Sequence, residues 1–209
     1  MTIDTTDLDD FSINYGNKWA SFGTGHSHGQ LFWKLMQQGL VLPGGTEMTV
    51  GMGLWLGGGR GLLTSLHGLA VDTIREVEFV DSKGAIRTAS ASENTEMFWF
   101  VRGGGGEFPG IVTKIVAQTS PVPGSVYRRE CSGSTYSAGK PMLKAWTRLL
   151  RETENSDRKM FTHVTINTGT IKYDNLCFDC GGGELNWFNN KVSSTAQQGG
   201  GMYCSSGYR

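Results

Sequence analysis

PGGTEMTVGMGLWLGGGRG, residues 43–61, is the passage that decides the fold of this chain, and it leads into GLAVD at residues 68–72. Nine glycines lie between positions 44 and 68. Glycine loses more conformational freedom on folding than any other residue, so this density requires a role that a side chain would prevent. The passage therefore predicts backbone at positive φ, or backbone that lies against a flat or anionic ligand.

A second glycine cluster, RGGGGEFPGIVT, follows at residues 102–113. Between the two clusters stand HGLAVD at residues 67–72 and EMFWFV at residues 96–101. Together these motifs resemble the FAD-binding domain of the vanillyl-alcohol oxidase / para-cresol methylhydroxylase (PCMH) superfamily, and in particular its berberine bridge enzyme-like branch. Several motifs in the family's order and spacing argue against a chance match, and the resemblance runs from about Ser12 to Pro123.

The resemblance implies an α+β fold. Residues 11–123 would form the second lobe of a PCMH-type FAD-binding domain, a mixed or antiparallel sheet with flanking helices, and residues 124–209 would begin an α+β substrate-binding domain. The PVPG sequence at residues 121–124 marks the boundary, because proline and glycine end regular structure. The family's first FAD lobe should precede this region and the rest of its substrate domain should follow it. The chain is therefore expected to be a fragment, an incomplete gene product or a domain that has lost half of its flavin site.

The same resemblance implies that the cofactor is FAD and that the backbone of the glycine passage meets it. The first loop would run along the cofactor, the triple glycine would let the backbone approach the flavin, and the strand after the second cluster would hold the adenine end. The residues concerned are Gly44, Gly45, Thr46, Thr49, Val50 and Gly51 in the loop, Gly57, Gly58 and Gly59 in the triple glycine, and Ile111 and Val112 in the strand. The alternative is that these glycines only turn the chain.

Three departures from the family concern flavin attachment and catalysis. Residues 45–51 read GTEMTVG where the family has Gly-x-Cys-Pro-Thr-Val-Gly, so this loop offers no cysteinyl bond to the flavin. A histidine that some members carry just before the triple glycine is replaced by Leu54 or Trp55. His26 resembles the histidine that bonds to flavin in the family, but it stands too close before the glycine loop, which argues against attachment. No catalytic residue is assigned.

Three other side chains are expected to have structural roles. Asp72 should cap the loop that precedes a strand, and His67 should pack within that loop. Arg102 is expected to pair with Glu96 or Glu107.

The chemistry that the resemblance implies is that of an FAD-dependent oxidoreductase, an oxidase in which a hydride passes from an alcohol, amine or sugar carbon to the flavin and dioxygen reoxidises it. The partners would be a small-molecule substrate and dioxygen, and the catalytic base would not be among the residues present. The alternative is a non-catalytic structural or binding protein that reuses the truncated scaffold, because loss of a lobe removes many cofactor contacts. Substrate and oligomeric state stay open.

Charge and hydropathy exclude several other classes of partner. Nineteen basic and nineteen acidic side chains leave the 209 residues without net charge, so no global field favours nucleic acid or an anionic membrane. Residues 1–127 carry eight basic and twelve acidic side chains and residues 128–209 carry eleven and seven, which hints at two folding units. The sequence contains no run of about eighteen apolar residues, so no membrane span is predicted. The acidic N-terminus predicts no signal peptide; a complete chain would be cytoplasmic, and one that lacks an upstream part could be secreted.

All four cysteines, Cys131, Cys177, Cys180 and Cys204, lie in the second half. CFDC at residues 177–180 has the spacing of a zinc or redox pair, but no second pair completes a metal site, and glycines rather than a helix start follow it. In a strand, positions 177 and 180 would point to opposite faces. Free or buried thiols are therefore favoured over a disulfide that involves Cys131 or Cys204, and no metal is expected.

Apolar patterning predicts the elements around these motifs. Strands are expected at residues 11–14, 18–23, 74–81, 85–89, 111–119, 126–131, 161–167 and 175–180. In the strand at 111–119, Ile111, Ile115 and Ala117 should share the buried side.

Three helical segments and an irregular tail complete the prediction. Ser27 and Gln30 form a capping box that begins a helix ending at Gly39. Short helices are expected at residues 62–66 and 97–102, and a longer one at 140–154. In the helix at residues 97–102, Phe98 and Trp99 should pack inward. The polar tail from residue 181 has little to bury and is expected to be poorly ordered.

Overall fold

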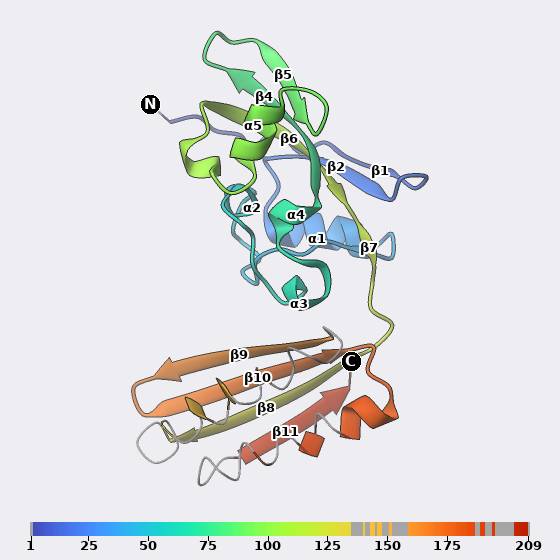
Figure 1. Cartoon of the computed structure of the whole chain (residues 1–209), viewed down its shortest axis with the longest axis vertical. Coiled ribbons are helices and arrows are strands. Elements are labelled where there is room, and N and C mark those ends of the chain that lie inside the picture. Colours follow the sequence, from blue (N-terminus) through green and yellow to red (C-terminus); the bar gives the residue numbers. More distant parts are fainter. Residues whose placement is uncertain are drawn as a thin grey trace. The chain divides into compact units, whose positions relative to one another are not determined.

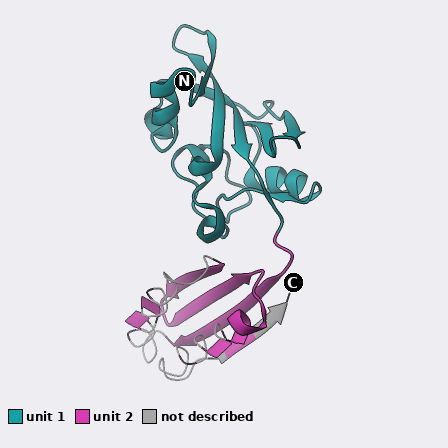
Figure 2. Cartoon of the chain, turned by 45° about the vertical axis from the view of Figure 1, so that its right-hand side comes forward, with its two compact units in different colours: residues 1–122 teal, residues 123–209 magenta. Residues whose placement is uncertain are grey.

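The computed structural model describes residues 2–134, 140, 143–144, 146–147, 151, 159–186, 189–190, 194 and 203–208. The chain divides into two compact units, unit 1 (Met1–Val122) and unit 2 (Pro123–Arg209), shown in Figures 1 and 2. Both units combine antiparallel sheets with helices, so the α+β fold class is confirmed. Most of the helix expected at residues 140–154 lies outside the described residues. No helix in the described part of the chain is long and apolar enough to cross a membrane.

Unit 1 is built on a five-stranded antiparallel sheet with the strand order β1-β2-β6-β4-β5. Its strands are β1 (Phe11–Asn14), β2 (Trp19–Gly23), β4 (Ile74–Asp81), β5 (Ile86–Ser90) and β6 (Gly110–Gln118). On one face Phe22 stands opposite Ile115, and both side chains are fully buried. On the other face Glu78 stands opposite Lys114. An antiparallel sheet with one apolar and one polar face needs a cover on one side only.

Helices supply that cover (Figure 1). They are α1 (His28–Met36), α2 (Gly53–Leu56), α3 (Thr64–His67), α4 (Ala70–Thr73), α5 (Thr95–Val101) and the 3-10 turn η1 (Gly105–Glu107). The predicted capping box begins α1: the Ser27 side chain accepts from the Gln30 N–H, and the Gln30 side chain accepts from the Ser27 N–H. Two short strands form a separate antiparallel ribbon: β3 (Leu40–Val41), which follows α1 in the chain, and β7 (Ser120–Pro121), which follows β6.

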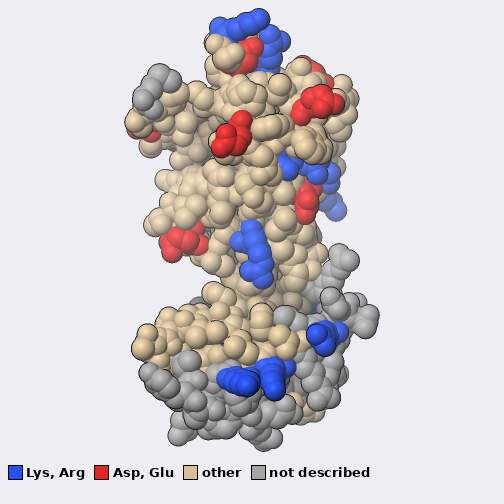
Figure 3. Space-filling model, turned by 60° about the vertical axis from the view of Figure 1, so that its left-hand side comes forward, with Lys and Arg blue, Asp and Glu red and all other residues tan. Residues whose placement is uncertain are grey.

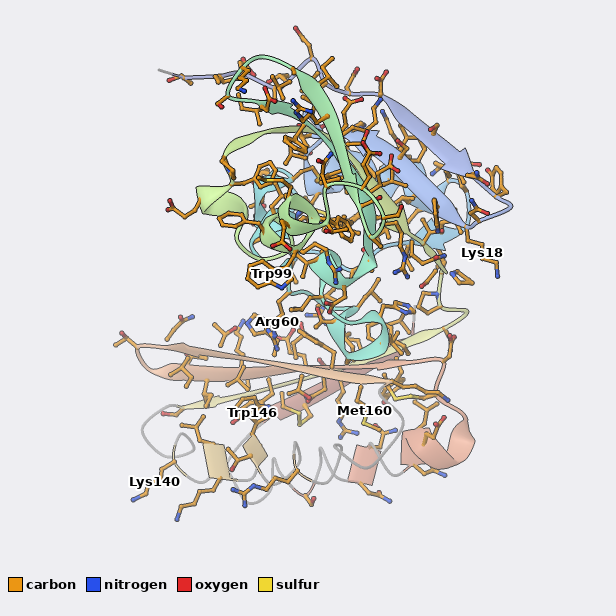
Figure 4. All side chains as sticks on the ribbon, turned by 45° about the horizontal axis from the view of Figure 1, so that its top comes forward. Lys18, Arg60, Trp99, Lys140, Trp146 and Met160 are labelled. Carbon is orange, nitrogen blue, oxygen red and sulfur yellow. A yellow bond between two sulfur atoms is a disulfide. The ribbon has the colours of Figure 1, made fainter. Side chains whose placement is uncertain are left out.

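Two predictions about buried side chains in unit 1 were wrong. Trp99 is 76% exposed (Figure 4), whereas Phe98 is buried, because the short α5 turns only the face of Phe98 and Val101 toward the core. In β6, Val112 rather than Ile111 is in the core. An irregularity where β6 pairs with β4 shifts the register by one residue, which reverses the alternation of faces.

Unit 2 is a four-stranded antiparallel sheet with the order β11-β8-β10-β9. Its strands are β8 (Val126–Ser134), β9 (Met160–Asn167), β10 (Thr170–Phe178) and β11 (Tyr203–Tyr208). One face holds a small core of Tyr127, Cys131, Ile171, Tyr173 and Cys177. Strand β11 comes from the tail that was expected to be poorly ordered. Main-chain pairing with β8 and the disulfide between Cys131 and Cys204 hold it to the sheet.

The favoured prediction of free thiols was also wrong, since the structure pairs Cys131 with Cys204 and Cys177 with Cys180. The first pair joins directly opposite positions of β8 and β11. The second is possible because β10 ends at residue 178 and Asp179 adopts a positive φ of 49°, so the chain turns back.

A helical turn does follow the CFDC sequence. Residues 182–186 are helical, and the Glu184 carboxylate accepts from the Gly181 N–H at 2.6 Å. This local capping bond explains why a run of glycines, which predicted no helix start, is nevertheless followed by one.

Candidate functional site

Residues 44–51, called the glycine loop below, are fixed to the first turn of α1. The His28 N–H donates to the Val50 carbonyl and the Gly29 N–H donates to the Met48 carbonyl, each at 2.8 Å. Ser27 and Gly51 form an isolated antiparallel bridge beside these bonds. The first N–H groups of a helix have no partner within the helix. The loop satisfies two of them, so its backbone path is set by α1.

Close packing explains why two loop positions are glycines. A Cβ on Gly44 would lie 2.7 Å from Cζ of Phe32, and a Cβ on Gly45 would lie 2.8 Å from Cε1 of His28. A Cβ on Gly61 would collide with the carbonyl oxygen of Gly44. The backbones at positions 44 and 61 therefore cross at a distance that no side chain allows.

An apolar cavity of about 160 Å³ opens beside the loop. Backbone and side chains of α1, β3, the glycine loop and the segment before α3 line it: Phe32, Leu35, Met36, Leu40, Val41, Leu42, Gly44, Gly45, Thr46, Met48, Leu62 and Leu63. Sites for drug-sized ligands enclose about 300–1,000 Å³. This cavity alone would hold only part of a dinucleotide cofactor.

Two buried ring nitrogens flank the loop without a hydrogen-bond partner among the described residues: Nε1 of Trp55 and Nε2 of His28. The Trp55 indole N–H is a donor only, and it lies 3.0 Å from the place that a Cβ of Gly44 would take. Glycine backbone at a cavity and apolar walls are what one edge of a flavin requires. The residues present fit one wall of such a site.

The remaining predicted loop residues divide into two groups. Thr46 lines the cavity, and Val50 is held through its carbonyl as described. The Thr49 hydroxyl instead donates to Oε1 of Glu47 at 3.0 Å. Gly51 is exposed, and a Cβ there would meet nothing within 4 Å. The structure thus brings Gly44, Gly45 and Thr46 to the cavity.

The triple glycine directly follows α2 in the chain, and its backbone is hydrogen-bonded to the start of α4. The Gly58 carbonyl accepts from the Val71 N–H at 3.2 Å, and the Gly59 carbonyl accepts from the Ala70 N–H at 3.1 Å. Gly59 has a φ of 70°, and a Cβ there would collide with Ala70. Gly58, with a φ of 136°, has open space around it. Gly57 is exposed. These contacts are internal to the chain, and none of the three glycines lines the cavity.

Ile111 and Val112 lie in β6, within the sheet. Val112 is buried, and its carbonyl accepts from the Thr24 hydroxyl at 2.8 Å, while Ile111 is half-buried. Neither residue lines the cavity. The structure does not bring them together with the glycine loop.

Asp72 has the capping role that was predicted, since its Oδ2 accepts from the Leu69 N–H at 2.9 Å. The prediction for Arg102 was wrong. Its Nε donates to the Val71 carbonyl at 3.3 Å and its guanidinium lies 5.1 Å from the Phe98 ring centroid, so a carbonyl and an aromatic face take the place of a carboxylate.

The two remaining histidines named in the sequence are structural. Nδ1 of His67 lies 3.4 Å from the Ser120 hydroxyl, and burial lowers the pKa of His67. His26 is buried; its Nδ1 donates to the Gly23 carbonyl at 3.0 Å, and its Nε2 accepts from Nζ of Lys34 at 2.8 Å. Both ring nitrogens of His26 therefore have protein partners.

Sequence reasoning missed His28, the residue that touches both Gly45 and the Glu47 carbonyl. Its place directly after the N-cap of α1 was visible in the sequence. The sequence does not show that the glycine loop returns to the N-terminal end of α1, where His28 lies.

Comparison with known proteins shows which proteins the chain is similar to. Residues 1–90 match the family described as "FAD binding domain". The chain is 37% identical over 127 residues to an uncharacterized FAD-linked oxidoreductase, YgaK, of Bacillus subtilis, covering 58% of this chain and 28% of the relative. It is 31% identical over 164 residues to berberine bridge enzyme-like 11 of Arabidopsis thaliana, covering 75% of this chain and 30% of the relative.

Solved structures show the same fold. Physcomitrella patens BBE-like 1 aligns with a TM-score of 0.85 at 23% identity, over 97% of this chain and 43% of that protein. A xylooligosaccharide oxidase from Myceliophthora thermophila, solved in complex with xylobiose, aligns with a TM-score of 0.84 at 24% identity, over 98% and 43%.

The fold and the family match define a flavoprotein whose cofactor is FAD. Within that class, residues 1–90 belong to the FAD-binding domain family, and the chain is similar to FAD-linked oxidoreductases, including those of the berberine bridge enzyme-like branch. It spans less than a third of the length of the curated relatives described above.

Proposed function

We propose that this protein takes part in an FAD-dependent oxidation in which a hydride leaves an alcohol, amine or sugar carbon of a small molecule and dioxygen is the final acceptor. The observation that carries the proposal is the glycine loop, fixed to α1 and bordering the apolar cavity with Gly44, Gly45 and Thr46. FAD, when bound, supplies the hydride acceptor. The structural neighbours named for oligosaccharide oxidation make sugars the first substrates to test.

The chain's own residues would bind and orient. The backbone of residues 44–51 would run along the cofactor, with Gly44, Gly45 and Thr46 at its edge. Phe32, Leu42 and Leu63 would exclude water from the apolar edge. Gly57 and Gly58, which have no close neighbours at a Cβ position, stay candidates for backbone approach to the ligand.

Unit 2 would begin the substrate-binding domain. One face of its sheet carries a charged cluster in which Arg128 Nε donates to Asp174 Oδ1 at 2.7 Å and Arg128 Nη2 donates to Glu130 Oε2 at 3.0 Å. Such paired donors and acceptors suit a substrate rich in hydroxyl groups.

The second candidate function is a non-catalytic binding protein on the same scaffold. It is favoured by Gly59 and Gly61, because the packing of Ala70 and Gly44 within unit 1 accounts for both glycines without a ligand.

A reconstitution experiment separates the two functions. The purified chain would be mixed with FAD, desalted, and examined for the visible absorption of bound oxidised flavin. Hydrogen peroxide release would then be measured with xylobiose, a primary alcohol and a primary amine. We expect retained flavin, and peroxide at a low rate with at least one substrate class, because the catalytic base is not expected among the residues present. A folded chain that yields no peroxide, whether or not it retains flavin, contradicts the proposed oxidation and supports the non-catalytic protein.

A further inference from the structure

The imidazole of His28 adds a third contact to the two backbone bonds that fix the glycine loop to α1. Its Nδ1 lies 3.2 Å from the carbonyl oxygen of Glu47. A carbonyl oxygen only accepts, so Nδ1 must carry the proton and Nε2 is bare in the neutral ring. The hydrogen bond therefore selects one tautomer, and that tautomer holds the peptide between residues 47 and 48.

The ring itself is held from both sides. It stacks on Phe32 with a centroid distance of 5.5 Å and an interplanar angle of 12°. On the loop side, Cε1 lies 2.8 Å from the position of a Cβ on Gly45, so only a glycine lets the ring enter. The His28 residue is fully buried. Because the ring cannot move, its hydrogen bond to Glu47 fixes the position of that part of the loop.

The electrostatic surroundings favour the neutral ring. Burial lowers the pKa of His28, although the bond to the Glu47 carbonyl opposes that shift. The titratable groups on the elements packed against it are already engaged. On α1 and the residues before it, Lys34 bonds to His26, and in the loop the Glu47 carboxylate accepts from Thr49. Neither pair offers His28 a counter-ion.

We propose that His28 is the positioning residue of the flavin-binding loop: its neutral imidazole, wedged between Phe32 and Gly45, fixes the Glu47 peptide so that residues 44–51 keep the path that a bound FAD requires. The proposal rests on the function proposed above. It concerns a side chain that does not line the cavity and that acts through the loop alone.

Two variants separate the contributions of the ring. His28→Phe keeps the stacking on Phe32 but removes the donor. His28→Asn places an amide N–H at the site of Nδ1 and cannot titrate. FAD affinity would be measured by fluorescence titration of the 209-residue chain and both variants between about pH 5 and pH 8. Hydrogen-exchange protection of the Gly29 amide, which bonds to the loop, would be measured without FAD.

Loss of one hydrogen bond should weaken FAD binding by His28→Phe about tenfold and lower Gly29 protection. His28→Asn should stay within about threefold of the parent near pH 7. The parent should lose affinity toward pH 5 as the ring is charged, and His28→Asn should lose less. Equal Gly29 protection in the parent and His28→Phe would overturn the proposal. Absence of FAD binding by the parent would refute the proposed function instead, because Gly29 protection tests the positioning role without FAD.

Discussion

Gly61 and Gly44 meet through their backbones, and neither position leaves room for a side chain. Gly59 is constrained in the same way by Ala70. By contrast, a Cβ at Gly51 or Gly53 would meet nothing within 4 Å. The glycine passage therefore contains two kinds of position. Packing within the fold requires glycine at some of them, and at the others the surrounding space would admit a side chain.

This contrast gives a matched pair of variants. Gly61→Ala drives a methyl group into the Gly44 carbonyl, so it should lower the free energy of unfolding of unit 1 by about 3 kcal/mol. Gly53→Ala, in the first turn of α2, should raise it by up to about 1 kcal/mol because alanine costs less backbone entropy. Urea unfolding followed by tryptophan fluorescence measures both. Equal effects of the two substitutions would show that the crossing of residues 44 and 61 is not tightly packed.

At the scale of elements, the β4–β5 hairpin is closed by one carboxylate. Oδ1 of Asp81 accepts from the N–H groups of Lys83 and Ala85 at 2.8 and 3.0 Å, and Oδ2 accepts from Nε of Arg87 at 2.7 Å. These bonds, led by that from Arg87, lower the pKa of Asp81 from 3.8 to about 2. The turn is thus stabilised by the charged form.

A depressed carboxyl pKa contributes stability that is present above the unfolded value of 3.8 and is lost as the pH falls toward 2. In Asp81→Asn this contribution should be absent, so the variant should melt lower than the parent near neutral pH and the difference should vanish in acid. Melting temperatures recorded for both proteins from about pH 6 to pH 2 test this. Parallel curves over the whole range would contradict it.

The elements that the sequence predicted well are those whose signals are local. The capping box at Ser27 and Gln30 forms α1, and the alternation at residues 74–81 forms β4 with those bounds. The failures are tertiary. The register shift in β6 depends on its partner β4, and β11 is held to the sheet by its pairing with β8. Cys180 reaches Cys177 through the positive φ of one intervening residue.

The candidate site follows the same division. The glycine-rich motif singled out Gly44, Gly45 and Thr46, which line the cavity, and their contact with FAD stays a prediction. His28 could not be predicted, because its contact with Glu47 joins residues 19 positions apart that come together only when the loop returns to α1. Ile111 and Val112 were assigned to the adenine end from motif order; they lie in β6 and do not line the cavity, and their contact with the cofactor stays a prediction.

At the scale of the whole molecule, each unit has its own core. Unit 1 centres on Trp55 and Phe22, which meet edge to face with ring centroids 5.3 Å apart. Unit 2 has a smaller core that includes both disulfides' buried cysteines, Cys131 and Cys177. On the face drawn in Figure 3, acidic and basic side chains lie among neutral ones over unit 1. The cavity and the glycine loop belong wholly to unit 1.

The central claim is that residues 44–51 form one wall of a flavin site, and amide hydrogen exchange with and without FAD tests it most directly. We expect that added FAD slows exchange in the glycine loop and in the first turn of α1, while the β4–β5 hairpin, which lies outside the cavity lining, stays unchanged. Slower exchange elsewhere in unit 1 with no change in residues 44–51, in a chain that binds FAD, would contradict the claim.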